Sequence, residues 1–247
     1  MGLFEDVSSA VRERKDSEVT ELVLGWHASY IVASDGRCGI GYVPASYKEE
    51  HRGREEHTGL LLGGTLARLA ELLVSPFPQE FAAATAACAA LFPFPGGGFQ
   101  MDFIMPCARG DKVAVLGYER EAIPLMRDWG WKLAVFDDRR RGPDCFPQKD
   151  FADGVRDAEW VWLSPEAVRD RWLISTSDAL KEKKGCFLHG PGLPWLSESF
   201  AALGVTHLVS PAVAGNAKSA QARIAAGGDP WLCPELEWRV HFTAYSI

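Results

Sequence analysis

The segment from His189 to Pro194 holds the residue types in this sequence that most strongly suggest binding chemistry. Its order is His189, Gly190, Pro191, Gly192, Leu193, Pro194. Glycine lets backbone N–H groups approach a ligand closely, and proline makes the loop rigid. The imidazole of His189 could ligate a metal or carry a proton. The alternative is a structural crossover between a strand and a helix, in which His189 is only hydrogen-bonded.

Two residues farther toward the amino terminus have the spacing of a nucleotide site. Gly117 follows a predicted strand over 112–116, and Asp137 ends the next predicted strand 20 residues later. A glycine at this position lets a phosphate or carboxylate approach the N-terminus of the following helix. An acidic residue about 20 positions later binds the ribose in nucleotide-binding domains. However, the three-glycine fingerprint is absent and Glu119 would repel a phosphate. A tight turn at Gly117 and a cap at Asp137 are the alternatives.

His27 and Ser29 form a polar pair in the first half of the chain. A predicted strand over 21–32 places both on one face, because side chains alternate along a strand. Such a face could line a cleft between domains, where small-molecule sites concentrate. A solvent-facing strand side is the alternative.

The second half predicts a parallel sheet that gathers several of these candidates. Short uninterrupted apolar runs alternate with helical patterns there, which is typical of doubly wound α/β folds. The strands are predicted over 112–116, 132–136, 158–163, 186–188 and 206–209, the helices over 122–128, 168–183 and 195–203, and a final edge strand over 235–245. Ligands of such sheets bind outside the carboxyl ends of the strands. The predicted binding surface therefore comprises Gly117, Asp137, Ser164, the segment 189–192 and Ser210.

The first half predicts an α+β domain. Its helices are expected over 3–16, 66–73 and 79–91, with a hairpin turn at Asp35–Gly36, a returning strand over 38–43 and an exposed loop over 45–58. The helix over 79–91 is apolar on all sides and should be buried. A linker rich in proline and glycine at 93–98 leads us to expect an α+β domain over 1–108 and a Rossmann-like domain over 109–247.

Composition excludes several function classes. The 247 residues carry a net charge of −7, which argues against nucleic-acid and anionic-membrane partners. No apolar run is long enough to span a membrane, and the charged start lacks a signal core, so we expect a cytoplasmic protein. The six cysteines form no Cys-x-x-Cys pair and are interpreted as buried thiols. The nine tryptophans are compatible with the core or with a homodimer interface.

Motifs distributed along the chain resemble the DUF4213/DUF364 family, whose members are labelled as heavy-metal chelation domains. They are Gly25-Trp26-His27-Ala28-Ser29, Gly39-Ile40-Gly41, Leu61-Leu62-Gly63, Lys112-Val113-Ala114-Val115-Leu116-Gly117, Gly190-Pro191-Gly192-Leu193-Pro194 and Asn216-Ala217. The resemblance covers roughly 21–224. It implies an amino-terminal domain similar to the enolase N-terminal fold, a Rossmann-like domain, and a site in the cleft between them. The residues it carries over are His27, Ser29, Gly117, Asp137, 190–194 and Asn216.

One position departs from the family pattern. The helix over 79–91 tends in the family to read Gly-x-Ala-Ala-x-Asn-Ala, and Ala89 stands here in place of the asparagine. Alanine has no side-chain group that could hydrogen-bond a ligand. If that asparagine contributes to the family's site, the chemistry of this member differs or is lost.

The sequence therefore predicts a protein that binds a small ligand in a cleft between two domains. The ligand would be a divalent or heavy metal ion, a metal chelate or a metabolite, with His27, His189 and Asp137 as the first metal ligands to test. The alternatives are an enzyme acting on a nucleotide or an S-adenosylmethionine-like molecule, and a regulatory or scaffolding protein whose site has decayed. No catalytic residue is assigned.

Overall fold

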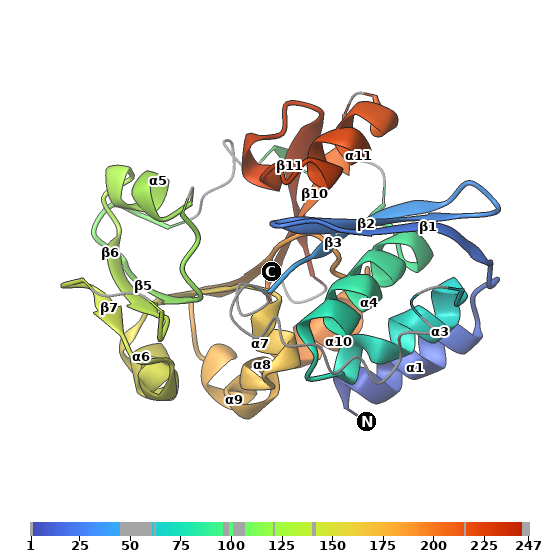
Figure 1. Cartoon of the computed structure of the whole chain (residues 1–247). Coiled ribbons are helices and arrows are strands. Elements are labelled where there is room, and N and C mark those ends of the chain that lie inside the picture. Colours follow the sequence, from blue (N-terminus) through green and yellow to red (C-terminus); the bar gives the residue numbers. More distant parts are fainter. Residues whose placement is uncertain are drawn as a thin grey trace. The chain divides into compact units, whose positions relative to one another are not determined.

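The chain folds into two compact units, each drawn from several stretches of sequence (Figure 1). The computed structural model describes residues 2–44, 61, 63–95, 99–100, 107–120, 122–139, 142–214 and 216–243. Unit 1 comprises residues 1–98, 190–196 and 210–239, and unit 2 comprises 99–189, 197–209 and 240–247. The sequence predicted one break, between 108 and 109, whereas the observed units interleave. The predicted loop over 45–58 lies outside the described residues.

Unit 1 contains a three-stranded antiparallel sheet in the order β1-β2-β3. The strands are β1 (Val19–Leu24), β2 (Ala28–Ala33) and β3 (Cys38–Tyr42). The single strand predicted over 21–32 is wrong. The chain turns between β1 and β2, where the N–H of Gly25 donates to the carbonyl of Ala28 at 3.0 Å. The hairpin predicted at Asp35–Gly36 is confirmed, with Gly36 at φ +86°.

Helices cover both faces of this sheet. They are α1 (Leu3–Arg12), α3 (Leu66–Ala70), the 3-10 helix η2 (Glu71–Val74), α4 (Pro78–Leu91), α11 (Ala217–Ala225) and the 3-10 helix η5 (Pro230–Leu232). As predicted, α4 is buried on almost every side. It lies directly on β3, because a Cβ atom at Gly39 would come within 2.2 Å of the Ala86 carbonyl. The helix α11 was not predicted. Its Ile224 packs with Ala28 and Tyr30 on the other face.

Unit 2 is built on a parallel sheet. The second sheet of the chain has eight strands in the order β4-β11-β10-β9-β8-β5-β6-β7. They are β4 (Phe99–Gln100), β5 (Lys112–Leu116), β6 (Lys132–Phe136), β7 (Cys145–Phe146), β8 (Trp160–Leu163), β9 (Gly185–His189), β10 (His207–Val213) and β11 (Leu236–Phe242). The pairs β6–β5, β5–β8, β8–β9 and β9–β10 are all parallel. The predicted doubly wound pattern is therefore confirmed. The sequence predicted Ser210 beyond the end of its strand, but β10 runs to Val213, so Ser210 lies within it.

The helices of unit 2 depart from the prediction in two places, since the helical segment over 148–157 was not predicted and the helix predicted over 168–183 is interrupted. They are α5 (Ala122–Asp128), the 3-10 helix η4 (Gln148–Asp150), α6 (Phe151–Asp157), α7 (Glu166–Arg169), α8 (Trp172–Ser175), α9 (Ser177–Leu180) and α10 (Ser197–Ala202). The continuous helix predicted over 168–183 is wrong. Arg171 adopts a left-handed conformation at φ 61°, and Thr176 donates its hydroxyl to the Trp172 carbonyl at 2.7 Å. Hydroxyl side chains compete for helical carbonyls in this way. Figure 1 shows α5 on one face of β5 and β6 and α6 on the other.

Aromatic side chains fill much of the core of unit 2. Every residue of β8 and β9 is buried. The ring of Phe187 lies between those of Trp162, at 5.1 Å, and His207, at 4.3 Å. These ring contacts hold Trp162, near the carboxyl end of β8, in place.

Candidate functional site

The order of the strands in unit 2 marks one edge of the sheet as a ligand site. Numbered along the chain, β5, β6, β8, β9 and β10 are strands 1 to 5, and their spatial order is 2-1-3-4-5. The direction of winding reverses between β5 and β8. In such sheets, ligands bind outside the carboxyl ends of the strands at this switch point. Gly117 and Ser164 are the residues that directly follow β5 and β8.

Gly117 and Ser164 are in close contact. Gly117 has φ +87°, a conformation that favours glycine. A Cβ atom built on it would lie 3.0 Å from the Ser164 Oγ and 3.9 Å from the Glu166 Oε2. A side chain at 117 would therefore crowd the Ser164 hydroxyl and come into contact with Glu166. The predicted turn at Gly117 and the predicted placement of Ser164 beside it agree with this geometry.

Two buried polar groups at the end of β8 lack hydrogen bonds. Within the described residues, neither the Ser164 Oγ nor the Trp162 Nε1 has a hydrogen-bond partner, and both atoms are buried. Residues two apart on a strand face the same side of a sheet. Buried polar groups without partners are rare in folded proteins and call for an explanation, such as a ligand or an ordered water.

Asp137 forms the acidic end of the site. Its carboxylate accepts hydrogen bonds from the Tyr118 N–H at 2.8 Å and from the Arg139 side chain at 2.9 and 2.7 Å. Burial raises the pKa of Asp137, but these hydrogen bonds outweigh burial and hold it below its ordinary value. Arg139 also lies 3.6 Å from the Glu166 Oε2. Asp137, Arg139 and Glu166 thus form a continuous charged row that ends beside Ser164.

His189 forms the other end of the site. The side chain is buried, and desolvation lowers its pKa to about 3, so the imidazole is neutral at physiological pH. Its Nε2 atom lies 3.6 Å from the Glu119 Oε1, and its ring lies 4.5 Å from the Trp162 ring. The carboxyl edge of the sheet therefore brings together four of the predicted residues, namely Gly117, Asp137, Ser164 and His189.

The other predicted site residues lie in unit 1. They are His27, Ser29, Gly190, Pro191, Gly192 and Asn216. His27 precedes β2, its side chain is 41% exposed, and its Nδ1 lies 3.9 Å from the Asp229 Oδ2. Ser29 is fully buried and donates its hydroxyl to the Ala82 carbonyl at 2.7 Å. The predicted strand face shared by His27 and Ser29 does not form. That all candidates line one cleft stays a prediction.

The loop over 190–194 is buried and packs within unit 1. A Cβ atom at Gly192, which has φ +82°, would lie 2.5 Å from the Thr85 Cβ and 2.9 Å from the Gly41 Cα. Glycine is therefore needed for close packing on α4 and β3. On the same helix, Ala89 packs next to Gly39, with its Cβ 3.0 Å from a Cβ built there.

Asn216 acts as the N-cap of α11. Its Oδ1 atom accepts hydrogen bonds from the N–H groups of Lys218 at 2.9 Å and Ser219 at 3.3 Å. Asparagine is among the residues that most favour this position. The side-chain oxygen of Asn216 is therefore engaged in helix capping.

Sequence reasoning did not identify three members of the site. Arg139 stands in the basic run Arg139-Arg140-Arg141, which matches no motif, and Glu166 follows Ser164 and Pro165 in a segment without a motif. Trp162 lies inside an apolar run typical of a core strand. The proximity of Arg139 to Asp137 in sequence was the one available signal.

A metal does not fit the described side chains. Among them, no group of three or more histidine, cysteine, aspartate or glutamate residues could hold an ion. His189 with Glu119 and His27 with Asp229 are pairs only. Cysteines in the described segments form no disulfide, and burial raises the pKa of the Cys88 thiol to about 12, which disfavours the thiolate that binds soft metals.

The fold is that of a Rossmann-like α/β unit accompanied by an α+β unit. The chain belongs to the DUF364 family. The model of that family, described as "Putative heavy-metal chelation", matches residues 100–239. The DUF4213 model, with the same description, matches residues 6–92. No helix among the described residues combines the length and apolarity needed to cross a membrane.

Two solved structures share the fold. A DUF364 protein of unknown function from Pyrococcus horikoshii is 16% identical, with a TM-score of 0.76 over 98% of this chain and 100% of its own. A second, from Desulfitobacterium hafniense DCB-2, is 21% identical, with a TM-score of 0.75 over 97% of this chain and 98% of its own. Comparison with curated proteins gave no match.

Proposed function

We propose that unit 2 binds a small uncharged or cationic organic molecule at the carboxyl edge of its sheet, between the ends of β5 and β8. The observation that carries this proposal is the buried Ser164 hydroxyl, which has no hydrogen-bond partner among the described residues and lies beside Gly117. Leaving such a group unsatisfied costs about 1–3 kcal/mol. A ligand that accepts its hydrogen bond would recover that cost.

The buried donors indicate what the ligand must present. The indole N–H of Trp162 can only donate, and the hydroxyl of Ser164 can donate or accept. A carbonyl oxygen, a ring nitrogen or a hydroxyl of the ligand would satisfy both groups. The neutral imidazole of His189 packs on Trp162 and adds one more polar contact without adding charge.

The charges of the site argue against a phosphate. The carboxyl groups of Asp137 and Glu166 lie beside one guanidinium, that of Arg139, and the carboxyl group of Glu119 lies beside the neutral imidazole of His189. An anionic ligand would be repelled at a partly buried site where charges are poorly screened. Asp137 already accepts hydrogen bonds from Arg139 and Tyr118, which argues against the ribose-binding role on which a nucleotide ligand would depend.

A stability measurement tests whether Ser164 is kept for binding. Ser164→Ala removes an unsatisfied hydroxyl, so the ligand-free protein should become more stable by about 1 kcal/mol. Ser29→Ala is the matched control, because Ser29 is equally buried but donates to Ala82. It should lose about 1 kcal/mol in the same urea titration. Equal losses for both variants would remove the basis of the proposal.

A binding measurement tests the ligand class. Thermal shifts with adenosine, S-adenosylmethionine and AMP compare a neutral, a cationic and a phosphorylated probe of related shape. We expect no shift with AMP beyond that of adenosine. A shift specific to AMP that Ser164→Ala abolishes would overturn the argument from charge.

Metal binding is tested separately because the family description names it. Calorimetry of metal-free protein with Zn²⁺ or Cd²⁺ should give no stoichiometric uptake at this site. A binding heat that disappears in His189→Gln and Glu119→Gln would show that this pair is part of a metal centre. A heat that persists in both variants would come from residues elsewhere in the chain.

A further inference from the structure

A hollow lies in unit 2 between α6 and the strands β5 and β6. It has a volume of about 420 Å³, within the range of small-molecule pockets. Its floor is apolar and is formed by Val113, Leu133, Ala134, Phe136 and Phe146. One wall of the hollow is formed by α6 and by the 3-10 turn η4 that precedes it. Leu133 and Ala134 remain partly exposed although β6 is an inner strand, because β7 beside it has only two residues.

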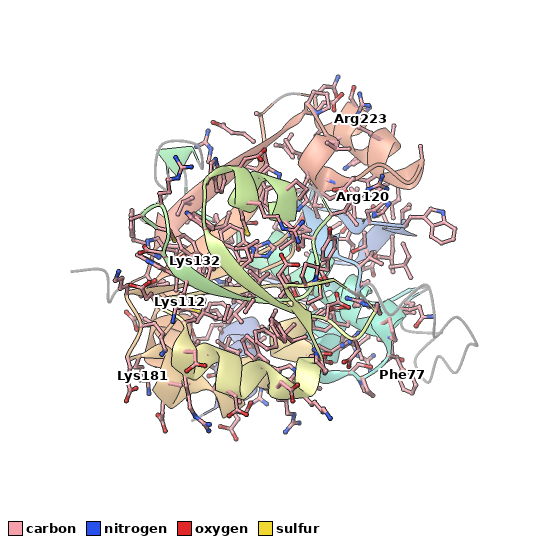
Figure 2. The ribbon with its side chains drawn as sticks, turned by 90° about the vertical axis from the view of Figure 1, so that its left-hand side faces the viewer. Phe77, Lys112, Arg120, Lys132, Lys181 and Arg223 are labelled. Atoms are coloured by element: carbon pink, nitrogen blue, oxygen red, sulfur yellow. The ribbon has the colours of Figure 1, made fainter. Side chains whose placement is uncertain are left out.

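Two lysines stand at one end of this hollow. Lys112 and Lys132 are direct register partners on β5 and β6, and both line the hollow. Figure 2 shows them next to each other. Neither forms an ion pair within the described part of the chain, and both side chains are exposed. Two adjacent ammonium groups repel each other, so an anion between them would be stabilised.

Acidic residues face the lysines from α6 and the turn before it. Asp150, Asp153, Gly154 and Asp157 line the hollow, at spacings that place them on one helix face. Asp153 pairs with Arg156. Asp150 and Asp157 form no ion pair with any described residue. Asp157 lies at the same end as the lysines, because it precedes β8, whose Trp160 pairs with Val113.

The geometry points to a binding site for a small zwitterion with an apolar body, such as a free amino acid with an aromatic or aliphatic side chain. The carboxylate would lie between Lys112 and Lys132, and the ammonium group would face Asp157. The apolar side chain would cover Ala134 and extend toward Phe136. Opposite charges that line one hollow without pairing leave both free for such a ligand.

The test uses three related probes on the full-length protein. L-phenylalanine carries both charges, 3-phenylpropionate lacks the ammonium group, and phenethylamine lacks the carboxylate. Each missing ion pair at an exposed site is worth up to about 1 kcal/mol, so each analogue should bind up to about fivefold more weakly. Binding is followed by NMR shifts of Ala134 and Gly154. No saturable shift with L-phenylalanine, or equal affinity for all three probes, would overturn the inference.

Two variants locate the carboxylate contact. The double variant Lys112→Met, Lys132→Met should weaken L-phenylalanine binding by up to about fivefold, as loss of the ligand's carboxylate does, and should not weaken phenethylamine binding. Lys181→Met is the control, since Lys181 pairs with Asp178 outside the hollow. Equal effects of the double variant and the control would overturn the inference. So would a dimer in solution that the double variant dissociates, because a second copy would then occupy the hollow.

Discussion

The Ser164 hydroxyl oxygen lies 3.0 Å from the point that a Cβ atom would occupy at Gly117. These two residues end the neighbouring strands β5 and β8, where the winding of the sheet reverses. A side chain at residue 117 would press against the Ser164 hydroxyl, so this close approach of the two strand ends requires glycine. The candidate site thus depends on Gly117 for its backbone geometry and on Ser164 for its polar group.

Gly117→Ala should destabilise the protein by more than backbone strain alone. At φ +87° alanine is strained by about 1–2 kcal/mol, and its methyl group would also crowd the Ser164 Oγ. Gly36→Ala is the control, since Gly36 has φ +86° and a Cβ atom placed on it would have no neighbouring atom within 4 Å. The free energy of unfolding of both variants, measured in urea, separates the two effects, because Gly36→Ala reports backbone strain alone and Gly117→Ala reports strain plus crowding. If Gly117→Ala costs no more than Gly36→Ala, the close contact with Ser164 is not real.

Arg139→Met should lower the free energy of unfolding by an amount that depends on pH. Hydrogen bonds from Arg139 and from backbone N–H groups outweigh burial and lower the pKa of Asp137. A carboxyl group whose pKa is lowered in the folded state stabilises the fold at pH values above its ordinary pKa of about 3.9. This stabilisation is lost as the pH falls through the pKa of the folded state. We expect the variant to lose about 1–3 kcal/mol at pH 7. The gap to the wild type should narrow below about pH 4.

The control for Arg139 is an exposed ion pair. Arg156 pairs with Asp153, and both side chains are more than two-thirds exposed, at 70% and 76%. Arg156→Met should change the free energy of unfolding by less than about 1 kcal/mol at any pH. A gap for Arg139→Met that stays constant down to pH 3 would mean that Asp137 is not its partner.

The sequence allowed prediction of most strands of unit 2, although β4 and β7 were missed. Buried parallel strands need uninterrupted apolar runs, so the carboxyl ends of β5, β6, β8 and β9 could be located within about one residue, whereas β10 runs four residues past its predicted end. Gly117, Asp137 and Ser164 then fell at one edge by topology alone. Arg139 and Glu166 could not be found in this way, because loop side chains reach the edge through tertiary contacts that no local pattern encodes.

In the first half of the chain, prediction from the sequence failed for a different reason. A single strand over 21–32 would have given His27 and Ser29 a common face, but Gly25 allows a turn and divides the strand in two. The position of α11 against β2 depends on residues about 190 apart in sequence, such as Ala28 and Ile224. Contacts of that separation leave no periodic signal in either segment.

Acidification should destabilise the protein through its buried histidines. Burial lowers the pKa of His189 to about 3 and that of His207 to about 4. Between these values and the ordinary value of about 6.5, the unfolded chain binds protons that the folded chain does not, so stability falls with pH. Between pH 7 and pH 5, each histidine should lower the free energy of unfolding by about 2 kcal/mol.

Glutamine variants isolate each histidine. His189→Gln should reduce the loss of stability between pH 7 and pH 5, whatever its effect at pH 7. His189 lies beside Trp162 and Glu119, and His207 lies beside Phe187, Phe242 and Thr206. His207→Gln should act independently, because the two rings have different neighbours. A wild type and a His189→Gln variant with identical pH dependence would show that His189 is accessible to solvent.

Asn216 should prove a structural residue of unit 1. Asn216→Ala removes the acceptor for the Lys218 and Ser219 N–H groups and should cost about 1 kcal/mol. Asn216→Asp keeps the acceptor and adds a negative charge near a helix start, so its stability should equal or exceed that of the wild type. Both variants should bind any ligand of unit 2 as the wild type does. If Asn216→Asp abolishes binding while remaining stable, the side-chain amide contacts the ligand and the capping role is secondary.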